Sequence, residues 1–252
     1  MRLAAVAAAA SVLAATAVAG AARPPVALIA SPAHVALAGS ARTPLAVTNS
    51  GTDPMVVDVT RAGFSLDLRG RPRVAARRLS WLVVAPRQLT IAPGATATLT
   101  VSSRVPPGAE PGDHSELVLL TTRSPTARGL PVRVRLGVVV VVRAPGRVVR
   151  RISAVRIRTR RAGHAKVLGL LLANRGNVTE TVGGTCALVW LHRHGQILAR
   201  LRAPERRILP HASGLVELIY RGRSRGHVLA RIAPPSRPDC PRIRSRELAV
   251  TL

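Results

Sequence analysis

Apolar and polar residues alternate along much of this chain with a period of two, which is typical of half-buried β-strands. The clearest case is residues 96–101, where threonines alternate with Ala, Leu and Val. A Pro-Gly pair at 93–94 precedes this segment, and a Pro-Pro-Gly run at 106–108 follows it. Both are turn signals, so residues 91–122 are predicted to form a turn, a strand, a second turn and a second strand.

The rest of the chain repeats this pattern of short segments separated by Gly, Pro or Asn. Strands are predicted over 26–37 with a break at Ser31-Pro32, and over 43–48, 55–60, 64–68, 79–84, 116–122, 131–143, 152–157, 166–173, 186–191, 196–202, 215–220, 228–232 and 247–252. Residues 69–78 are predicted to form a basic loop. No segment combines helical periodicity with helix caps. Short strands separated by Gly/Pro turns are typical of β-sandwiches, so the fold class is expected to be all-β.

Two pieces of sequence recur in the same order. LAVTNSGTDPMVV and LLLANRGNVTETV align so that Asn49 matches Asn174, 125 residues later. Further on, Pro93 matches Pro210, 117 residues later. Two ordered matches with similar spacing indicate an internal duplication. The chain is therefore predicted to hold two tandem immunoglobulin-like β-sandwiches, because each half approaches the roughly 100 residues of such a domain.

The predicted boundary between the two sandwiches is Ala144-Pro145-Gly146. Pro cannot donate a hydrogen bond to a sheet ladder, and Gly is unfavourable inside a strand. The preceding strand is therefore expected to stop here, which gives domains over 26–144 and 147–252. The Asn-x-Gly turns of the two repeats are expected at matching corners of the two sandwiches.

Residues 1–22 have the organisation of a secretory signal peptide. Met1-Arg2 supplies a short positive region, an Ala-rich apolar run follows, and small residues around Ala19 offer cleavage positions. The mature protein is predicted to begin within 20–26 and to be secreted or held in the cell envelope. The alternative is an uncleaved anchor, since the apolar run approaches the length of about 20 residues that crosses a bilayer. No membrane span is predicted in the mature chain.

Cys186 and Cys240 are the two cysteines of the chain. An even number of cysteines in an exported protein predicts a disulfide. On the chain-entropy model, a bridge with this separation would stabilise the fold by about 4 kcal/mol. The alternative is one buried thiol and one thiol in a loop.

The formal net charge of +27 comes almost entirely from arginine, because Lys166 is the one lysine. Two interpretations are open: codon bias in a GC-rich bacterial genome, which the composition alone favours, and attraction to an anionic partner, which the size of the charge suggests. Five arginines near the domain boundary are candidate anion-binding residues: Arg147, Arg150, Arg151, Arg156 and Arg158. The alternative is an ordinary solvated face. Arg156 and Arg158 are expected on one face of a strand.

Motifs for enzymatic chemistry are missing from the sequence. Lys166 does not lie in a Gly-Lys-Ser/Thr phosphate-binding loop, and the 11 carboxylates are scattered without a pair suited to acid–base catalysis. His192 and His194 would share a strand face, but an exposed hairpin explains them and no third metal ligand is evident. The protein is therefore predicted to be non-enzymatic, without catalytic, cofactor-binding or metal-binding residues.

Three turn motifs carry a family resemblance. They are Thr-Asn-Ser-Gly-Thr at 48–52, Ile-Ala-Pro-Gly-Ala at 91–95, and Val-Pro-Pro-Gly-Ala-Glu-Pro-Gly-Asp-His at 105–114. Together they resemble the first domain of WxL-interacting bacterial surface proteins, within the broader bacterial immunoglobulin-like domains related to pilus chaperones. The resemblance covers about residues 26–143. It implies a sandwich that binds peptidoglycan and a second sandwich that binds surface partners.

The leading functional hypothesis is a non-enzymatic secreted or cell-surface protein of the binding or adhesion type. Its partner would be a cell-wall polymer or another exported protein, bound through an exposed strand edge within 132–142. The alternative is a periplasmic chaperone for surface-fibre subunits, in which Arg147, Arg150 or Arg151 would anchor a client carboxylate. Specific nucleic-acid binding is disfavoured by the predicted export, the missing recognition motifs and the scarcity of aromatic residues. The oligomeric state is left open.

Overall fold

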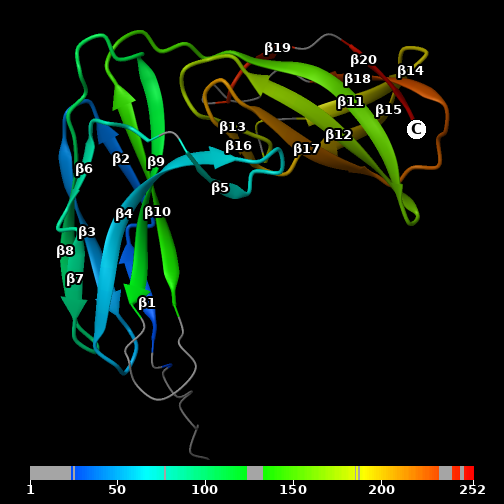
Figure 1. The fold of residues 1–252 in the computed structure, drawn as a ribbon. Coiled ribbons are helices and arrows are strands. Elements are labelled where there is room, and N and C mark those ends of the chain that lie inside the picture. The colour runs from blue at the N-terminus through cyan, green and yellow to red at the C-terminus, as the bar shows by residue number, and fades with distance from the viewer. Residues whose placement is uncertain are drawn as a thin grey trace, which may run out of the picture.

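The computed structural model describes residues 24, 26–76, 78–123, 133–184, 186, 188–232, 240–244 and 247–252. The predicted signal peptide, 1–22, lies outside the described residues. The described part of the chain folds into strands and turns that form two lobes set at an angle to each other (Figure 1). The predicted fold class is confirmed: the protein is all-β and consists of two tandem immunoglobulin-like β-sandwiches. Within the described ranges, no helix has the length and hydropathy needed to cross a membrane.

The first lobe packs a four-stranded sheet against a larger one. The smaller sheet has the order β1-β3-β8-β6, with strands at Leu28–Ser31, Arg42–Asn49, Thr96–Ser103 and Leu82–Ala85. The larger sheet has the order β2-β10-β9-β4-β5, with β7 also paired to β4; these strands are His34–Ala38, Arg135–Ala144, Gly112–Arg123, Met55–Leu66, Pro72–Ala75 and Gln88–Ile91. The predicted break at Ser31-Pro32 is where the chain passes from the smaller sheet to the larger one.

The second lobe is built in the same way from two four-stranded sheets. One has the order β17-β12-β11-β19, with strands at Ser213–Tyr220, Ala165–Asn174, Ile152–Ala162 and Ile243–Arg244. The other has the order β15-β14-β18-β20, with strands at Gln196–Arg202, Leu188–Arg193, His227–Ile232 and Leu248–Thr251. A two-stranded sheet of β13 (Glu180–Val182) and β16 (Arg206–Ile208) lies at the end that adjoins the first lobe (Figure 1).

Each lobe has its own apolar core, as the period of two requires. In β8, Leu99 and Val101 are buried while the threonines beside them are exposed. The first core also contains residues such as Val118 and Val140, and a separate cluster around Leu168 and Leu218 fills the second lobe. Since a buried aliphatic side chain contributes about 1.5–3 kcal/mol, each lobe has a substantial hydrophobic driving force of its own.

The Asn-x-Gly turns occupy matching corners of the two sandwiches. The side-chain nitrogen of Asn49 donates to the backbone oxygens of Asp53 and Ile91, at 2.8 and 3.1 Å, and its oxygen accepts from the Gly51 N–H at 3.0 Å. Asn174 makes the equivalent bonds to Val178, Ile208 and Gly176, at 2.8, 3.1 and 2.9 Å. The partner residues are related by the same offsets of 125 and 117 that relate the sequence repeats. In both repeats, the Asn of the motif therefore stabilises the same corner of the sandwich through the same three hydrogen bonds.

Two sequence predictions for residues 55–78 are wrong: the break between two strands, and the loop that follows them. Residues 55–60 and 64–68 were expected to be separate strands, but β4 runs unbroken from Met55 to Leu66 because Arg61, Ala62 and Gly63 all pair with β9. The basic loop expected at 69–78 contains β5, which pairs back onto the end of β4. The β4–β5 hairpin reaches from the first lobe to the second (Figure 1).

Candidate functional site: the inner angle between the lobes

The larger sheet of the first lobe faces the concave side of the bend, below the second lobe (Figure 1). We call this concave region the inner angle; it is bordered by the outward faces of β10, β9 and β4 and by the second lobe. Three features lie along it: an unpaired strand edge, an apolar face and a pocket at the junction of the lobes.

On one side, the N-terminal half of β10 has no partner strand within the part of the chain that the structure describes. β10 pairs with β9 along its length, whereas β2 covers its other side only over Val139–Arg143. Val139 donates its N–H to Ala33, and Val134 accepts from the Thr122 N–H on the opposite side. Because backbone groups alternate in direction along a strand, Arg135 and Gly137 point theirs away from β9. Among the described strands none pairs with this side of Arg135–Val138, which we call the open edge of β10.

An apolar face lies beside the open edge. Leu117 and Leu119 on β9 and Ala62 on β4 are buried on the face that points away from the core, and Phe64 and Val139 pack against them. Gly137 lies opposite Leu119, and a Cβ there would touch the δ-carbons of Leu117 and Leu119 at only 3.6 and 3.7 Å. The missing side chain thus places the Gly137 backbone directly against this apolar cluster, next to the open edge.

Asp113 links the two lobes. Its side chain is 3% exposed, accepts from Arg143 Nε at 2.7 Å and from the Thr179 N–H at 2.8 Å, and its own N–H donates to Asn177 at 2.7 Å. Burial raises the pKa of Asp113, but the hydrogen bonds from Arg143 and Thr179 outweigh it and hold the pKa below its usual value. Gly112 has a φ of +114°, and a Cβ there would overlap the backbone of Asn177. The first residues of β9 therefore fit closely against the second lobe.

The tip of the β4–β5 hairpin makes a second connection. The Leu215 N–H of β17 donates to the backbone oxygen of Leu68 at 2.6 Å. Arg69 lies 3.9 Å from Glu217, an exposed pair of small energetic value. The hairpin tip thereby contacts the edge of β17, and both connections restrain the angle between the lobes.

A pocket of about 320 Å³ lies between the lobes. Phe64, Arg78 and Ser115 line it from the first lobe, and Asn177 and His211 line it from the second. His211 Nε2 lies 2.9 Å from a carboxylate oxygen of Glu110, and both side chains are exposed. On β2, burial lowers the pKa of His34, and the positive charge of Arg207 on β16 lowers it further.

Glu116 is a fully buried carboxylate close to this pocket. Its Oε2 accepts from the Leu79 N–H at 2.6 Å, and its Oε1 lies 3.6 Å from Arg61, which also donates to the backbone oxygens of Leu79 and Leu82. Burial raises the pKa of Glu116, while the hydrogen bond from Leu79 and the charge of Arg61 oppose the rise. The group holds the connection between β5 and β6 against the sheet.

Glu116→Gln is expected to change how stability depends on pH. The pKa of Glu116 is raised in the folded protein, so above pH 4.5, the ordinary pKa of a Glu, the folded protein still holds a proton that the unfolded chain has released. The stability that protonated Glu116 contributes is fully present below the unfolded-state pKa and is lost as the pH rises through the folded-state pKa. The free energy of unfolding of the variant, relative to that of the wild type, should therefore increase toward neutral pH, by at most about 1.4 kcal/mol per pH unit. Urea denaturation across pH 4–7 measures it, and a constant difference contradicts it.

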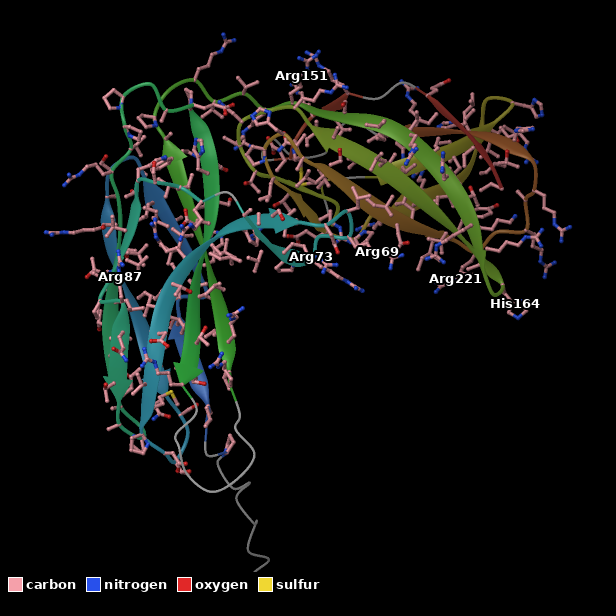
Figure 2. All side chains as sticks on the ribbon, in the orientation of Figure 1. Arg69, Arg73, Arg87, Arg151, His164 and Arg221 are labelled. Carbon is pink, nitrogen blue, oxygen red and sulfur yellow. A yellow bond between two sulfur atoms is a disulfide. The ribbon has the colours of Figure 1, made fainter. Side chains whose placement is uncertain are left out.

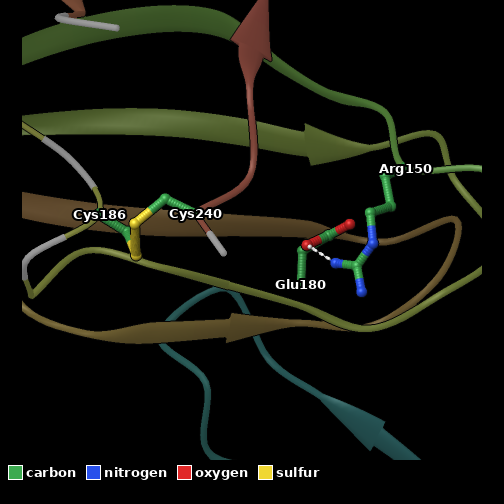
Figure 3. Close-up of a disulfide and its surroundings, with 4 residues drawn as sticks. All are labelled: Arg150, Glu180, Cys186 and Cys240. Carbon is green, nitrogen blue, oxygen red and sulfur yellow. Dashed lines mark hydrogen bonds and ion pairs between the residues drawn. A yellow bond between two sulfur atoms is a disulfide. The ribbon is translucent and has the colours of Figure 1, made fainter. Parts of the chain in front are cut away.

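The five arginines proposed from sequence do not form one cluster in the inner angle. Figure 2 shows Arg151 on the outer side of the junction, away from Arg69 and Arg73. Arg150 is held by Glu180, 2.9 Å from its Nη1, and Glu180 is 2% exposed (Figure 3). Burial raises the pKa of Glu180, and the charge of Arg150 opposes this. Anion binding by these residues stays a prediction.

The remaining members of that set are placed separately. Arg147 is exposed in the linker, and its backbone oxygen accepts from Asn177 at 2.8 Å. Arg156 and Arg158 are exposed at alternate positions of β11, on one strand face as expected. Asp113 and Glu180, which sequence reasoning did not select, are the residues that organise the junction. The sequence offers one signal for them: carboxylates are few in this basic chain. A carboxylate that becomes buried needs a charged or hydrogen-bonding partner.

Cys186 and Cys240 form the predicted disulfide, with their Cα atoms 5.1 Å apart (Figure 3). Cys186 precedes β14, and Cys240 precedes β19 and β20. The bridge therefore ties the C-terminal strands of the second lobe to the start of β14.

Comparisons with known proteins place the fold. No family model matches the chain, and no curated protein matches it. Among solved structures, the class 5 fimbriae chaperone CfaA is similar, with 11% sequence identity, a TM-score of 0.54, and coverage of 89% of this chain and 98% of that chain. A chain from a chaperone–tip adhesin complex of CFA/I fimbriae biogenesis is similar at 10% identity, with the same TM-score and coverage. At such identities the likeness shows the fold alone.

These findings correct two predictions. The resemblance to WxL-interacting surface proteins was wrong, because the similar structures are fimbrial chaperones and neither a family model nor a curated protein supports that family. Asn49, from one of the motifs behind this resemblance, makes hydrogen bonds that stabilise a corner of the sandwich. Such motifs therefore indicate the fold and not a wall ligand. The adhesion-type function with a cell-wall partner was also wrong, because the similar structures are fimbrial chaperones.

Proposed function

We propose that this protein is an exported, non-enzymatic periplasmic chaperone that binds subunits of a surface fibre. The open edge of β10 carries the proposal, because it borders the inner angle of a two-lobed fold similar to that of fimbrial chaperones. The predicted signal peptide supports export, and one of the similar structures is a complex of a chaperone with a tip adhesin, which supports a protein as the partner.

Client binding would proceed by addition of a strand to the open edge. The backbone N–H and C=O groups of Arg135 and Gly137 supply affinity that is independent of client sequence, and pockets for alternate side chains supply selectivity. The apolar face around Leu117 and Leu119 lies beside Gly137, so an apolar client side chain opposite Gly137 would pack against the edge of this apolar cluster. A client with an unpaired strand and exposed apolar residues would be protected from aggregation in this way.

Gly137→Pro is expected to weaken client binding by about 10-fold or more, because it removes the N–H that points to the open edge while the bonds to β9 stay intact. Gly137→Ala is the matched control, since it keeps the N–H and its Cβ makes only ordinary contacts. The measurement is the amount of soluble complex recovered when each variant is exported together with a candidate fibre subunit from the source genome. Equal recovery with Gly137→Pro and Gly137→Ala, at unchanged thermal stability, would contradict the proposal.

A further inference from the structure

The outward face of the β15-β14-β18-β20 sheet carries arginines on both sides of a tryptophan. Trp190 on β14 is opposite Arg200 on β15 and opposite Arg231 on β18. The Arg200 guanidinium carbon lies 5.8 Å from the centre of the indole ring, within reach of a cation–π interaction. Arg202 lies two residues beyond Arg200 on the same face. Across the sheet this makes a row of Arg, Trp and Arg.

A row of apolar residues runs next to the arginine row. His192 follows Trp190 on the same face of β14 and is opposite Ile197 on one side and Leu229 on the other. Ile197 is 43% exposed and Leu229 is 42% exposed, although both are large aliphatic residues on a folded surface. We call these two rows together the Arg-Trp face. On this face, half-buried Trp190 and His192 thus lie between exposed arginine and aliphatic side chains.

No carboxylate of the described residues balances the charge of the Arg-Trp face by direct contact. Within the described residues, none of Arg200, Arg202 and Arg231 forms an ion pair with a carboxylate. Most of the formal charge of +27 is carried by residues 147–252. Charges of one sign on one surface add their potentials, so this face attracts anions well beyond contact distance.

We propose that the Arg-Trp face binds the surface of an anionic phospholipid membrane. Arginine pairs with phosphate groups, tryptophan favours the interface between water and acyl chains, and exposed Ile and Leu side chains gain by entering the acyl boundary. An acidic polypeptide would satisfy the arginine row but would leave Ile197 and Leu229 exposed to water. Figure 1 shows β14, β18 and β20 toward the end of the second lobe that is remote from the first, so the inner angle stays free.

The test is cosedimentation of the purified exported protein with vesicles at physiological ionic strength. Vesicles of phosphatidylcholine with about one-third phosphatidylglycerol should bind the protein, and phosphatidylcholine alone should not. Replacing Arg200 and Arg231 together by Gln should weaken binding by about 30-fold. The matched control replaces Arg42 and Arg104, two exposed arginines of the first lobe, by Gln; it removes the same charge and should weaken binding by less than about threefold.

The second readout is the fluorescence of Trp190. In a Trp81→Phe background Trp190 is the one tryptophan, and its emission should shift to the blue and be quenched by phosphatidylglycerol with brominated acyl chains. Equal losses in the two double variants, or binding without quenching, would overturn the proposal in favour of nonspecific charge attraction. Binding to polyglutamate that depends on Arg200 and Arg231, without binding to vesicles, would overturn it in favour of an acidic polypeptide.

Discussion

Replacing Cys186 and Cys240 together by Ala is expected to lower the free energy of unfolding of the second lobe by about 4 kcal/mol. The bridge joins residues separated by 54 positions, so its loss releases a long loop in the unfolded chain. In the folded chain, the same change frees the segment that leads into β19 and β20, which complete the edges of both sheets of the second lobe. Guanidinium denaturation of the variant and of the wild type, with and without reductant, measures the difference.

The first lobe provides the internal control for the disulfide. Both cysteines belong to the second lobe, so the unfolding transition of the first lobe should keep its midpoint in the double variant. Reduced wild type should behave like the variant. A loss below about 1 kcal/mol, or a wild type that takes up alkylating label without reductant, would refute the expected role of the bridge.

Asn174→Ala is expected to lower the stability of the second lobe by about 3 kcal/mol. The change removes three buried hydrogen bonds at once and leaves the backbone groups of Gly176, Val178 and Ile208 without their partner. Each unsatisfied buried group costs about 1–3 kcal/mol, and partial access of water reduces the sum. Chemical denaturation followed by circular dichroism measures the effect.

Asn49→Ala is the matched variant in the first lobe, because Asn49 makes the equivalent three bonds. If the two lobes unfold independently, each substitution should shift one transition and leave the other in place. The domains predicted at 26–144 and 147–252 would then be separate cooperative units. A single transition shifted alike by both variants would contradict that division, and a loss below about 1 kcal/mol would contradict the role of the corners.

The junction shows why the angle between the lobes could not be predicted from sequence. Asp113 belongs to the turn motif at 105–114, yet its partners are Arg143, Thr179 and Asn177, which lie 30 to 66 positions away along the chain. Local patterns carry no information about such contacts. Arg150 was grouped with other arginines by its position in the sequence, whereas the fold pairs it with Glu180.

The function was misjudged for a related reason. The turn motifs that indicated a wall-binding family are requirements of the sandwich itself, and unrelated proteins that share the fold meet the same requirements. Whether β10 is covered or open depends on how far β2 extends along it, and β2 lies about 100 residues earlier in the chain. Only the assembled sheet shows that, among the described strands, none pairs with this side of Arg135–Val138.

By itself, the sequence determined the all-β class, most of the strands, the duplication and its Asn corners, and the disulfide. These depend on side-chain periodicity, turn chemistry and cysteine number, which act within a few residues or follow from composition. The tertiary structure alone decided the bend between the lobes, the open edge of β10 and the Arg-Trp face. Each of these depends on which distant strands become neighbours, and that choice is made by the packing of whole sheets rather than by any local segment.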